Sequence, residues 1–312
     1  MPGTTSSNAA SATNSLGPNV LVILAGISWG LLGVFLRMLS LASLSALDIC
    51  ALRNIGTALV LGIALALWSR QSFRICWRDI WCFVGGGCVS ILLFNYCYFL
   101  TIQRTSIGVA VTLLYTSPIF IALLARVLFH EPFTRRKSLA LILMFCGCAL
   151  VSGIADGKPT LSLTGMLTGL GSGLCYALYT IFGRYAQKRG YPTATITFWN
   201  FLCAALASCL LPRWDFVADA FTQQPMLWLW GAALVGISTI LPYCCYTAGL
   251  ARMEASRAAV LVAVEPMVAT LAGIIFFHEC LSLAVTCGIL LVLGAILVLQ
   301  IPPKKDGITG NS

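Results

Sequence analysis

The sequence predicts an all-α integral membrane protein in which ten transmembrane helices form two inverted five-helix repeats. Its 312 residues are 59% hydrophobic and only 9% charged, whereas soluble domains carry about 25% charged residues. Apolar runs of about twenty residues, the length that crosses the hydrocarbon core, follow one another from Asn19 onward, and the second part of the chain repeats the first. This composition excludes a soluble enzyme, a disordered protein and a nucleic-acid binder.

Ten apolar runs are predicted to span the membrane, with connections too short for a soluble domain. They occupy residues 19–39, 46–68, 80–102, 107–129, 138–154, 161–186, 193–211, 226–250, 256–277 and 281–300. Residues 1–18 are rich in Ser, Thr and Asn and lack the basic start and apolar core of a secretory signal, so we expect a disordered tail. Residues 301–312 form a C-terminal tail.

The basic residues predict the orientation of the spans. With a cytoplasmic N-terminus, thirteen Lys and Arg residues fall in the inner segments and four in the outer ones. Basic residues collect in short cytoplasmic loops. We therefore expect both termini on the cytoplasmic side.

An internal repeat divides the chain into residues 19–154 and 161–300. Shifting residues 97–131 by 148 gives ten identities in 35 positions, among them Pro118 with Pro266 and Phe129-His130-Glu131 with Phe277-His278-Glu279. A repeat with an odd number of crossings begins its second copy from the opposite face, so the two halves must be inverted. Inverted repeats are typical of secondary transporters whose site lies at the midplane between the halves.

Several motifs recur in the two halves or mark single spans. They are GISWG in the first span, LRN around Arg53 and the paired endings SPIFIALLARVLFHEPFTRRKSLALILMFCGCALV and EPMVATLAGIIFFHECLSLAVTCGILLVLGAILV. In these motifs the chain resembles the EamA family of the drug/metabolite transporter superfamily. The resemblance implies a permease of the bacterial inner membrane, often an exporter of amino acids or other metabolites, with a central cavity and no ATP site.

Glu265 is the sharpest candidate for proton or charge coupling. It lies at the centre of the ninth span, where an ionised carboxylate is costly unless it faces a cavity, a partner or a proton. Pro266 beside it removes a helical hydrogen bond, and Pro118 occupies the equivalent place in the fourth span, so both prolines are predicted helix breaks or gates. A protonated Glu265 bonded to nearby backbone is the structural alternative.

Arg53 and Asn200 are predicted substrate-binding residues that the repeat pairs with each other. Each is a strong hydrogen-bonding group within a span and must be satisfied inside the protein. Arg53 could bind a substrate carboxylate, or pair with Glu265 or with Asp48. Asp48 lies at the outer end of its span, where the helix dipole favours it, and we expect a structural role.

Aromatic and amide side chains recur near mid-depth and predict a cavity for an amphipathic solute. An apolar body with one polar tip suits such a ligand, although each residue alone could be packing. The remaining predicted substrate-binding residues are Trp29, Asn95, Tyr98, Tyr115, Tyr176, Tyr179, Trp199, Tyr243 and Tyr246.

Glu131 and Glu279 end the fourth and ninth spans. Each precedes a hydroxyl residue, Thr134 or Ser282, that can cap the next helix. We predict a structural corner at each site, with a gate as the functional alternative.

No signal for enzymatic chemistry is present. The sequence has no phosphate-binding GxxxxGK[ST] loop, no CxxC metal pattern and only two histidines, so we expect neither cofactor nor metal. The predicted function is alternating-access transport of a small amphipathic metabolite, with membrane lipid as the surrounding partner and a monomer or homodimer as the assembly. The alternatives are a passive channel and a non-transporting membrane sensor or enzyme.

Overall fold

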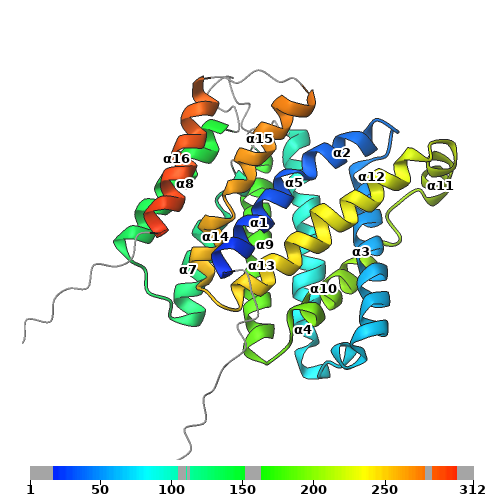
Figure 1. Ribbon diagram of the computed structural model, residues 1–312, viewed down its shortest axis with the longest axis horizontal. Coiled ribbons are helices and arrows are strands. Elements are labelled where there is room, and N and C mark those ends of the chain that lie inside the picture. Colours follow the sequence, from blue (N-terminus) through cyan, green and yellow to red (C-terminus); the bar gives the residue numbers. More distant parts are fainter. Residues whose placement is uncertain (1–16, 105–109, 111–112, 152–162, 278–282, 301–312) are drawn as a thin grey trace, which may run out of the picture.

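The computed structural model describes residues 17–104, 110, 113–151, 163–277 and 283–300, and every regular element in these ranges is a helix (Figure 1). The predicted tails lie outside the described residues, apart from positions 17 and 18. The helices of the first half are α1 (Pro18–Gly30), α2 (Leu32–Ser40), α3 (Ala46–Trp68), η1 (Arg70–Phe73), η2 (Trp77–Asp79), α4 (Ile80–Val84), η3 (Gly85–Leu93), α5 (Phe94–Arg104), α7 (Ser117–Phe129) and α8 (Arg135–Val151).

The second half repeats this order. Its helices are α9 (Leu163–Lys188), α10 (Thr193–Ser208), α11 (Trp214–Gln223), α12 (Met226–Val235), η5 (Gly236–Ile240), α13 (Leu241–Leu250), α14 (Ala255–Leu261), α15 (Val264–Phe277) and α16 (Leu283–Gln300). The short helix α11, in the connection between the seventh and eighth spans, is the one element here that the apolar runs did not predict.

Six stretches of the described chain are long and apolar enough to cross a membrane. They are Pro18–Ser40, Ala46–Trp68, Trp77–Thr101, Leu163–Lys188, Met226–Leu250 and Ala255–Phe276. Three shorter apolar helices occupy Ser117–Phe129, Thr193–Ser208 and Thr286–Ala295. The prediction of an all-helical membrane protein is confirmed.

Several predicted spans are interrupted helices. The third and eighth contain widened π-helical turns, η3 and η5, at equivalent places in the two halves. Within them a hydroxyl bonds back five residues: Ser90 Oγ donates to the Gly85 carbonyl at 3.1 Å, and Thr239 Oγ1 to the Leu234 carbonyl at 2.8 Å. Such turns often accompany functional sites in helices.

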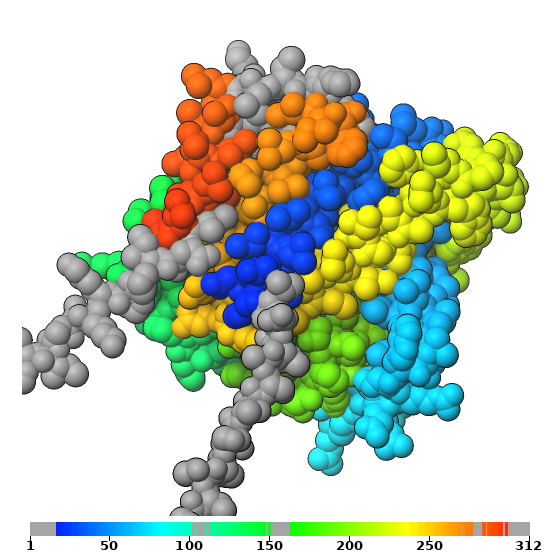
Figure 2. Space-filling view, in the orientation of Figure 1, coloured from blue at the N-terminus to red at the C-terminus, as the bar shows by residue number. Residues whose placement is uncertain are grey.

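The two halves interlock, so that helices of one half pack chiefly on helices of the other. Helix α1 packs on α13 and α15, and its counterpart α9 packs on α5 and α7; α3 packs on its counterpart α10, and α8 on α16. Figure 2 shows this on one face, where blue α1 lies between the orange and yellow helices of the second half. The contact pattern is therefore the two-fold one that the repeat predicts.

The α3–α10 pair gives the relative direction of the halves. Asn54 donates to Ser208 Oγ at 3.4 Å near the start of α3 and the end of α10. Gly62, eight residues further along α3, lies instead against the ring of Phe198 near the start of α10. Equivalent helices thus run antiparallel, which is what an inverted repeat requires.

Candidate functional site

Four rings from three helices form a contiguous aromatic cluster in the largest buried core. Trp29 of α1 lies 5.1 Å from Tyr243 and 5.5 Å from Tyr246 of α13, measured between ring centroids, and Tyr179 of α9 lies 5.1 Å from Tyr243. The contacts of Tyr243 with Trp29 and Tyr179 are edge-to-face, the geometry that ring quadrupoles favour. The cluster therefore joins the two halves at the centre of the bundle.

Two of these tyrosines have hydrogen-bond partners within the core. The Tyr246 hydroxyl lies 2.7 Å from Thr180 Oγ1, and the Tyr179 hydroxyl lies 3.1 Å from Thr247 Oγ1. Both bonds connect α9 to α13. Because a buried hydroxyl is costly to leave unpaired, these threonines hold the two rings in place, a role that the sequence alone did not indicate.

A second group of rings extends the cluster toward α5. Trp29 lies 6.3 Å from Tyr176, which lies 5.7 Å from Phe94, which in turn stacks on Tyr98 at 5.9 Å. Phe94 was not among the predicted residues. Because an apolar ring in an apolar span carries no distinguishing signal, only its place in the fold identifies it.

Glu265 lies beside these rings in the first turn of α15. The short turn at Val262 and Ala263 precedes it, and its backbone N–H donates to the Val262 carbonyl at 3.0 Å. The side chain is half-buried and is within electrostatic range of the hydroxyls of Tyr98 and Tyr176. Among the residues described, none makes a hydrogen bond or ion pair with its carboxylate.

Arg53 of α3 is buried, with 6% of its surface exposed, and its Nε and Nη2 atoms have no hydrogen-bond partner in the described chain. It pairs with neither of the carboxylates considered above. Asp48 instead caps α3 through Ser45 and accepts the Arg213 backbone N–H at 3.2 Å. Tyr243 is near enough to both Arg53 and Glu265 for their charges to act on its hydroxyl.

Four other predicted binding residues make contacts outside this group. Tyr115 packs in a separate core with Met144 and Val292. Trp199 packs beside Phe83 at 6.3 Å, and the Asn95 amide donates to the Ile91 carbonyl at 2.5 Å.

Asn200 is the fourth of these residues. It is buried against Gly86, and both of its amide atoms lack partners among the described residues. Because α3 and α10 run antiparallel, Asn200 lies about 12 Å along the pair from the level of Arg53, at 1.5 Å per residue, rather than beside it.

Both predicted helix-breaking prolines stand where a span is interrupted. Pro118 lies in the first turn of α7, after a turn at Tyr115 and Thr116, and Pro266 lies in the first turn of α15. Proline fits the first turn of a helix because its missing N–H is not needed there.

Glycines of the partner helices lie against these breaks. A methyl group at Gly26 of α1 would lie 2.9 Å from the Val262 carbonyl, and one at Gly173 of α9 would lie 3.0 Å from the Leu113 carbonyl. Equivalent glycines therefore contact equivalent breaks in the two halves.

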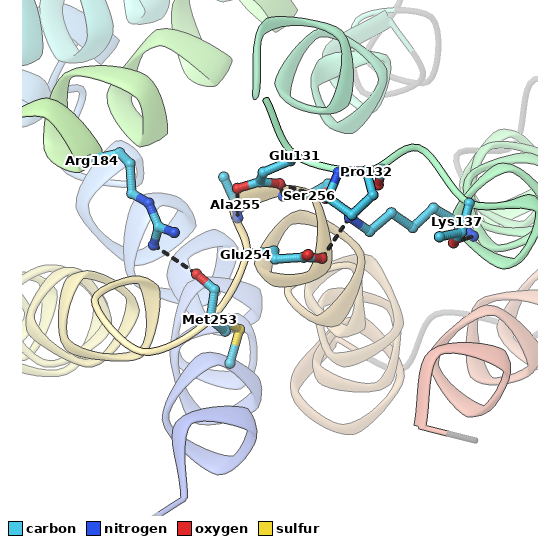
Figure 3. A network of polar contacts seen from close by, with 9 residues as sticks. Glu131, Pro132, Lys137, Arg184, Met253, Glu254, Ala255 and Ser256 are labelled. Carbon is cyan, nitrogen blue, oxygen red and sulfur yellow. Dashed lines mark hydrogen bonds and ion pairs between the residues drawn. The ribbon is translucent and has the colours of Figure 1, made fainter. Parts of the chain in front are cut away.

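Glu131 differs from the predicted corner. Its carboxylate does not stay within its own half but accepts hydrogen bonds from the backbone N–H groups of Ala255 and Ser256, at 2.9 and 3.4 Å, and from Ser256 Oγ at 2.9 Å (Figure 3). Thr134 does act as predicted, accepting the Lys137 N–H at 3.3 Å at the start of α8. Glu279 lies outside the described residues.

Together, a two-fold bundle of apolar helices and a polar-tipped aromatic cluster between its halves define a multi-pass membrane protein of the small-molecule transporter class. The described residues contain no cluster of three His, Cys, Asp or Glu side chains suited to a metal ion. The sequence comparison makes the assignment specific: the chain belongs to the EamA-like transporter family, whose profile matches residues 17–153 and again residues 163–301.

Curated relatives agree with this assignment. The chain is 27% identical over 294 residues to the uncharacterized transporter YwfM of Bacillus subtilis, covering 92% of this chain and 95% of that one. It is 30% identical over 215 residues to an uncharacterized transporter of Archaeoglobus fulgidus, covering 67% and 74% of the two chains. It is 29% identical over 203 residues to the threonine/homoserine exporter RhtA of Escherichia coli, covering 62% of each chain.

A solved crystal structure shares the fold. It superposes with a TM-score of 0.74 at 18% sequence identity, over 90% of this chain and 96% of that one. Membership of the EamA-like transporter family makes the protein a membrane transporter for a small molecule, not an enzyme.

Proposed function

We propose that this transporter exports an α-amino acid or a close amphipathic relative from the bacterial cytoplasm by alternating access. The substrate site lies between the halves, bounded by Arg53, Glu265 and the aromatic residues Trp29, Tyr176 and Tyr243. The named exporter among the relatives supports an amino acid as cargo.

The observation that carries the proposal is the pair of unsatisfied opposite charges. A buried guanidinium and an intramembrane carboxylate are each costly without a partner, yet Arg53 and Glu265 make no hydrogen bond or ion pair with any described residue. A zwitterion satisfies both, because its carboxylate accepts from the guanidinium and its ammonium donates to the carboxylate. The rings of the cluster contribute an apolar surface for the side chain.

Glu265 also serves as the coupling residue in this proposal. A carboxylate that binds either a proton or the substrate ammonium, but not both at once, links transport to the proton gradient. Replacing it with Gln abolishes that competition while keeping the size of the side chain.

The orientation in the proposal rests on the basic residues. Both termini face the cytoplasm of a bacterial inner membrane, so the start of α8, with Arg135, Arg136 and Lys137, is on the internal side. Tags on the two termini should be accessible only from the cytoplasmic side. A tag accessible from outside would contradict the proposed orientation of the chain in the membrane.

The test is counterflow of radiolabelled threonine in proteoliposomes that contain the purified full chain. Saturable counterflow supports a carrier, whereas flux that never saturates indicates a passive channel. The Arg53→Gln variant should bind threonine about 30- to 4,000-fold more weakly, because losing one partner of a buried charge pair costs about 2–5 kcal/mol. Arg78→Gln, at an exposed position in the short helix η2, is the matched control and should leave affinity unchanged.

Competing ligands separate the roles of the two charges. Threonine amide, which lacks the carboxylate, should compete poorly in the wild type and no worse than threonine in Arg53→Gln. The Glu265→Gln variant should lose the pH dependence of counterflow, with exposed Asp219→Asn as its control. If both variants transport threonine with wild-type affinity and pH dependence, these residues do not form the site.

A further inference from the structure

The contacts of Glu131 tie the two halves together at one end of the bundle, as the close-up in Figure 3 shows. Glu131 follows α7 in the first half, whereas its three donors belong to Ala255 and Ser256 in the second half. The side chain is buried, with 8% of its surface exposed. A carboxylate that accepts three hydrogen bonds is well satisfied, so this contact holds the halves together specifically.

The backbone of the first half places this carboxylate in advance. Helix α7 ends at Phe129, His130 follows in the left-handed region with φ 56°, and the Glu131 N–H returns to the Ala125 carbonyl at 3.2 Å. This is a helix end with a left-handed residue just past the last turn. It turns the chain away from the axis of α7 and positions Glu131 to contact the other half.

A second cross-half contact lies beside the first. Lys137 Nζ is 2.5 Å from the Glu254 carboxylate and also donates to the Pro132 carbonyl at 2.9 Å. Lys137 is buried, whereas Glu254 is partly exposed. We call Glu131 and Lys137 with their partners Glu254, Ala255 and Ser256 the latch.

The partner side of the latch is held rigid from within the second half. Arg184 of α9 donates through Nη1 to the carbonyls of Leu250 and Met253, the latter at 2.7 Å, at the end of α13 (Figure 3). Gln187 of α9 donates to the Thr247 carbonyl at 2.7 Å. The segment between α13 and α14, which the latch contacts, is therefore bonded to α9 of the same half, and we expect it to move with α9 and α13.

The latch lies at the end of the α7–α14 contact between the halves. Ala255, Ala258 and Ala259 of α14 and Ala125 of α7 are fully buried in the common core. Small side chains let the two helices approach closely. The polar bonds of the latch add directional contacts between the halves at this end of the bundle.

We propose that the latch is a gate of the transport cycle, and that it must break each time the site opens toward the face that carries Lys137. The inference rests on the alternating access proposed above. It assigns Glu131 a positioning role in transport, since its carboxylate bonds to Ala255 and Ser256 and not to the proposed substrate, and it identifies the described arrangement as closed on this face.

The first test fixes the latch covalently with a water-soluble carbodiimide. The reagent joins the Lys137 amine to the Glu254 carboxyl as an amide, and the carboxyl oxygen leaves in the urea by-product. Threonine counterflow should fall in proportion to the cross-linked fraction measured by mass spectrometry. Lys137→Arg is the matched control because it keeps the charge but forms no such amide, so the treated variant should stay active. Cross-linked molecules that exchange threonine at the untreated rate would overturn the gate.

The second test separates a gate from a merely structural contact. Glu131→Gln weakens the latch and favours the arrangement open toward its face. The apparent KM for threonine supplied from that face should fall, and the KM from the opposite face should rise by about tenfold, the equivalent of one charge-assisted hydrogen bond. Right-side-out and inside-out membrane vesicles give the two values. A structural role lowers the maximal rate equally from both faces and leaves each KM unchanged.

Two further measurements keep the outcome decisive. If Glu131→Gln does not fold, Ser256→Ala removes one donor only and should show the same opposite KM changes in smaller measure. If the wild type shows no threonine counterflow, the proposed cargo is wrong, and the cross-link yield becomes the test of the latch. A lower yield in Glu131→Gln than in Asp219→Asn supports the gate. Equal yields in the two variants overturn it.

Discussion

Gly30 offers the sharpest test of how closely the two halves approach beside the proposed site. A methyl group on Gly30 of α1 would lie 2.6 Å from Val268 Cβ and 2.7 Å from the Glu265 carbonyl oxygen. Ordinary contact needs about 3.5–4.0 Å. Gly30→Ala must therefore push α1 and α15 apart by about 1 Å, at the backbone that positions Glu265.

The size of the effect follows from two opposing terms. Overpacking a tight contact costs about 1–3 kcal/mol, and the two contacts at Gly30 involve backbone and a β-branched residue, which cannot give way easily. Replacing a helical Gly by Ala returns about 0.5–1 kcal/mol. We expect a net loss of about 1–2 kcal/mol. At about 2–4 °C per kcal/mol, the value for domains of roughly 150–250 residues, the unfolding midpoint should fall by a few degrees.

The matched control is on the same transmembrane segment. A methyl group on Gly33 of α2 meets nothing within 4 Å, so Gly33→Ala should keep or slightly raise the midpoint. Thermal unfolding of the purified variants in one detergent measures both. Threonine counterflow should fall in Gly30→Ala, because Glu265 is displaced, and should be normal in Gly33→Ala. Equal midpoints and equal transport in the two variants would refute the close approach of α1 and α15.

Two further predictions concern hydrogen bonds away from the proposed charges. Tyr246→Phe should lower the unfolding free energy by about 1–3 kcal/mol because Thr180 loses its partner. The double variant with Thr180→Val should lose less unfolding free energy than the two single variants lose together. Strictly additive losses would argue against the hydrogen bond. Tyr191→Phe should lower the midpoint, since its hydroxyl donates to Asp79 at 2.8 Å and accepts the Cys76 N–H at 2.9 Å. Removal from water raises the pKa of Tyr191, so its contribution is complete below the usual phenol pKa and is lost as the pH rises through the higher folded value. A wild type and a Tyr191→Phe variant that lose stability equally at high pH would contradict this.

The sequence predicted the substrate-binding residues only in part, because residue type and depth in the span were the only criteria available. Trp29, Tyr176, Tyr179, Tyr243 and Tyr246 do come together, since they lie on spans that the repeat places at the centre. Tyr115 and Trp199 have the same chemistry and similar depth but lie on other helix faces. In a span that is apolar all round, no polar face marks which side points inward.

The inverted repeat explains why Arg53 and Asn200 are equivalent in sequence but apart in space. A two-fold axis in the membrane plane relates a position slightly on the outer side of the midplane to an equivalent position slightly on its inner side. Only the antiparallel contacts of α3 with α10 show that the two residues lie at different levels of this helix pair.

The sequence by itself determined the solvent, the number of apolar runs, the repeat and its inversion, because these depend on composition, length and parity. The tertiary structure decided which rings meet, where helices widen at η3 and η5, and that Glu131 reaches across to Ala255 and Ser256 instead of closing its own corner. The contacts that join the halves, such as Trp29 with Tyr243 and Glu131 with Ala255, connect residues far apart in the sequence. Neither hydrophobicity nor local spacing encodes such contacts, since lipid and protein interior are equally apolar surroundings for a helix.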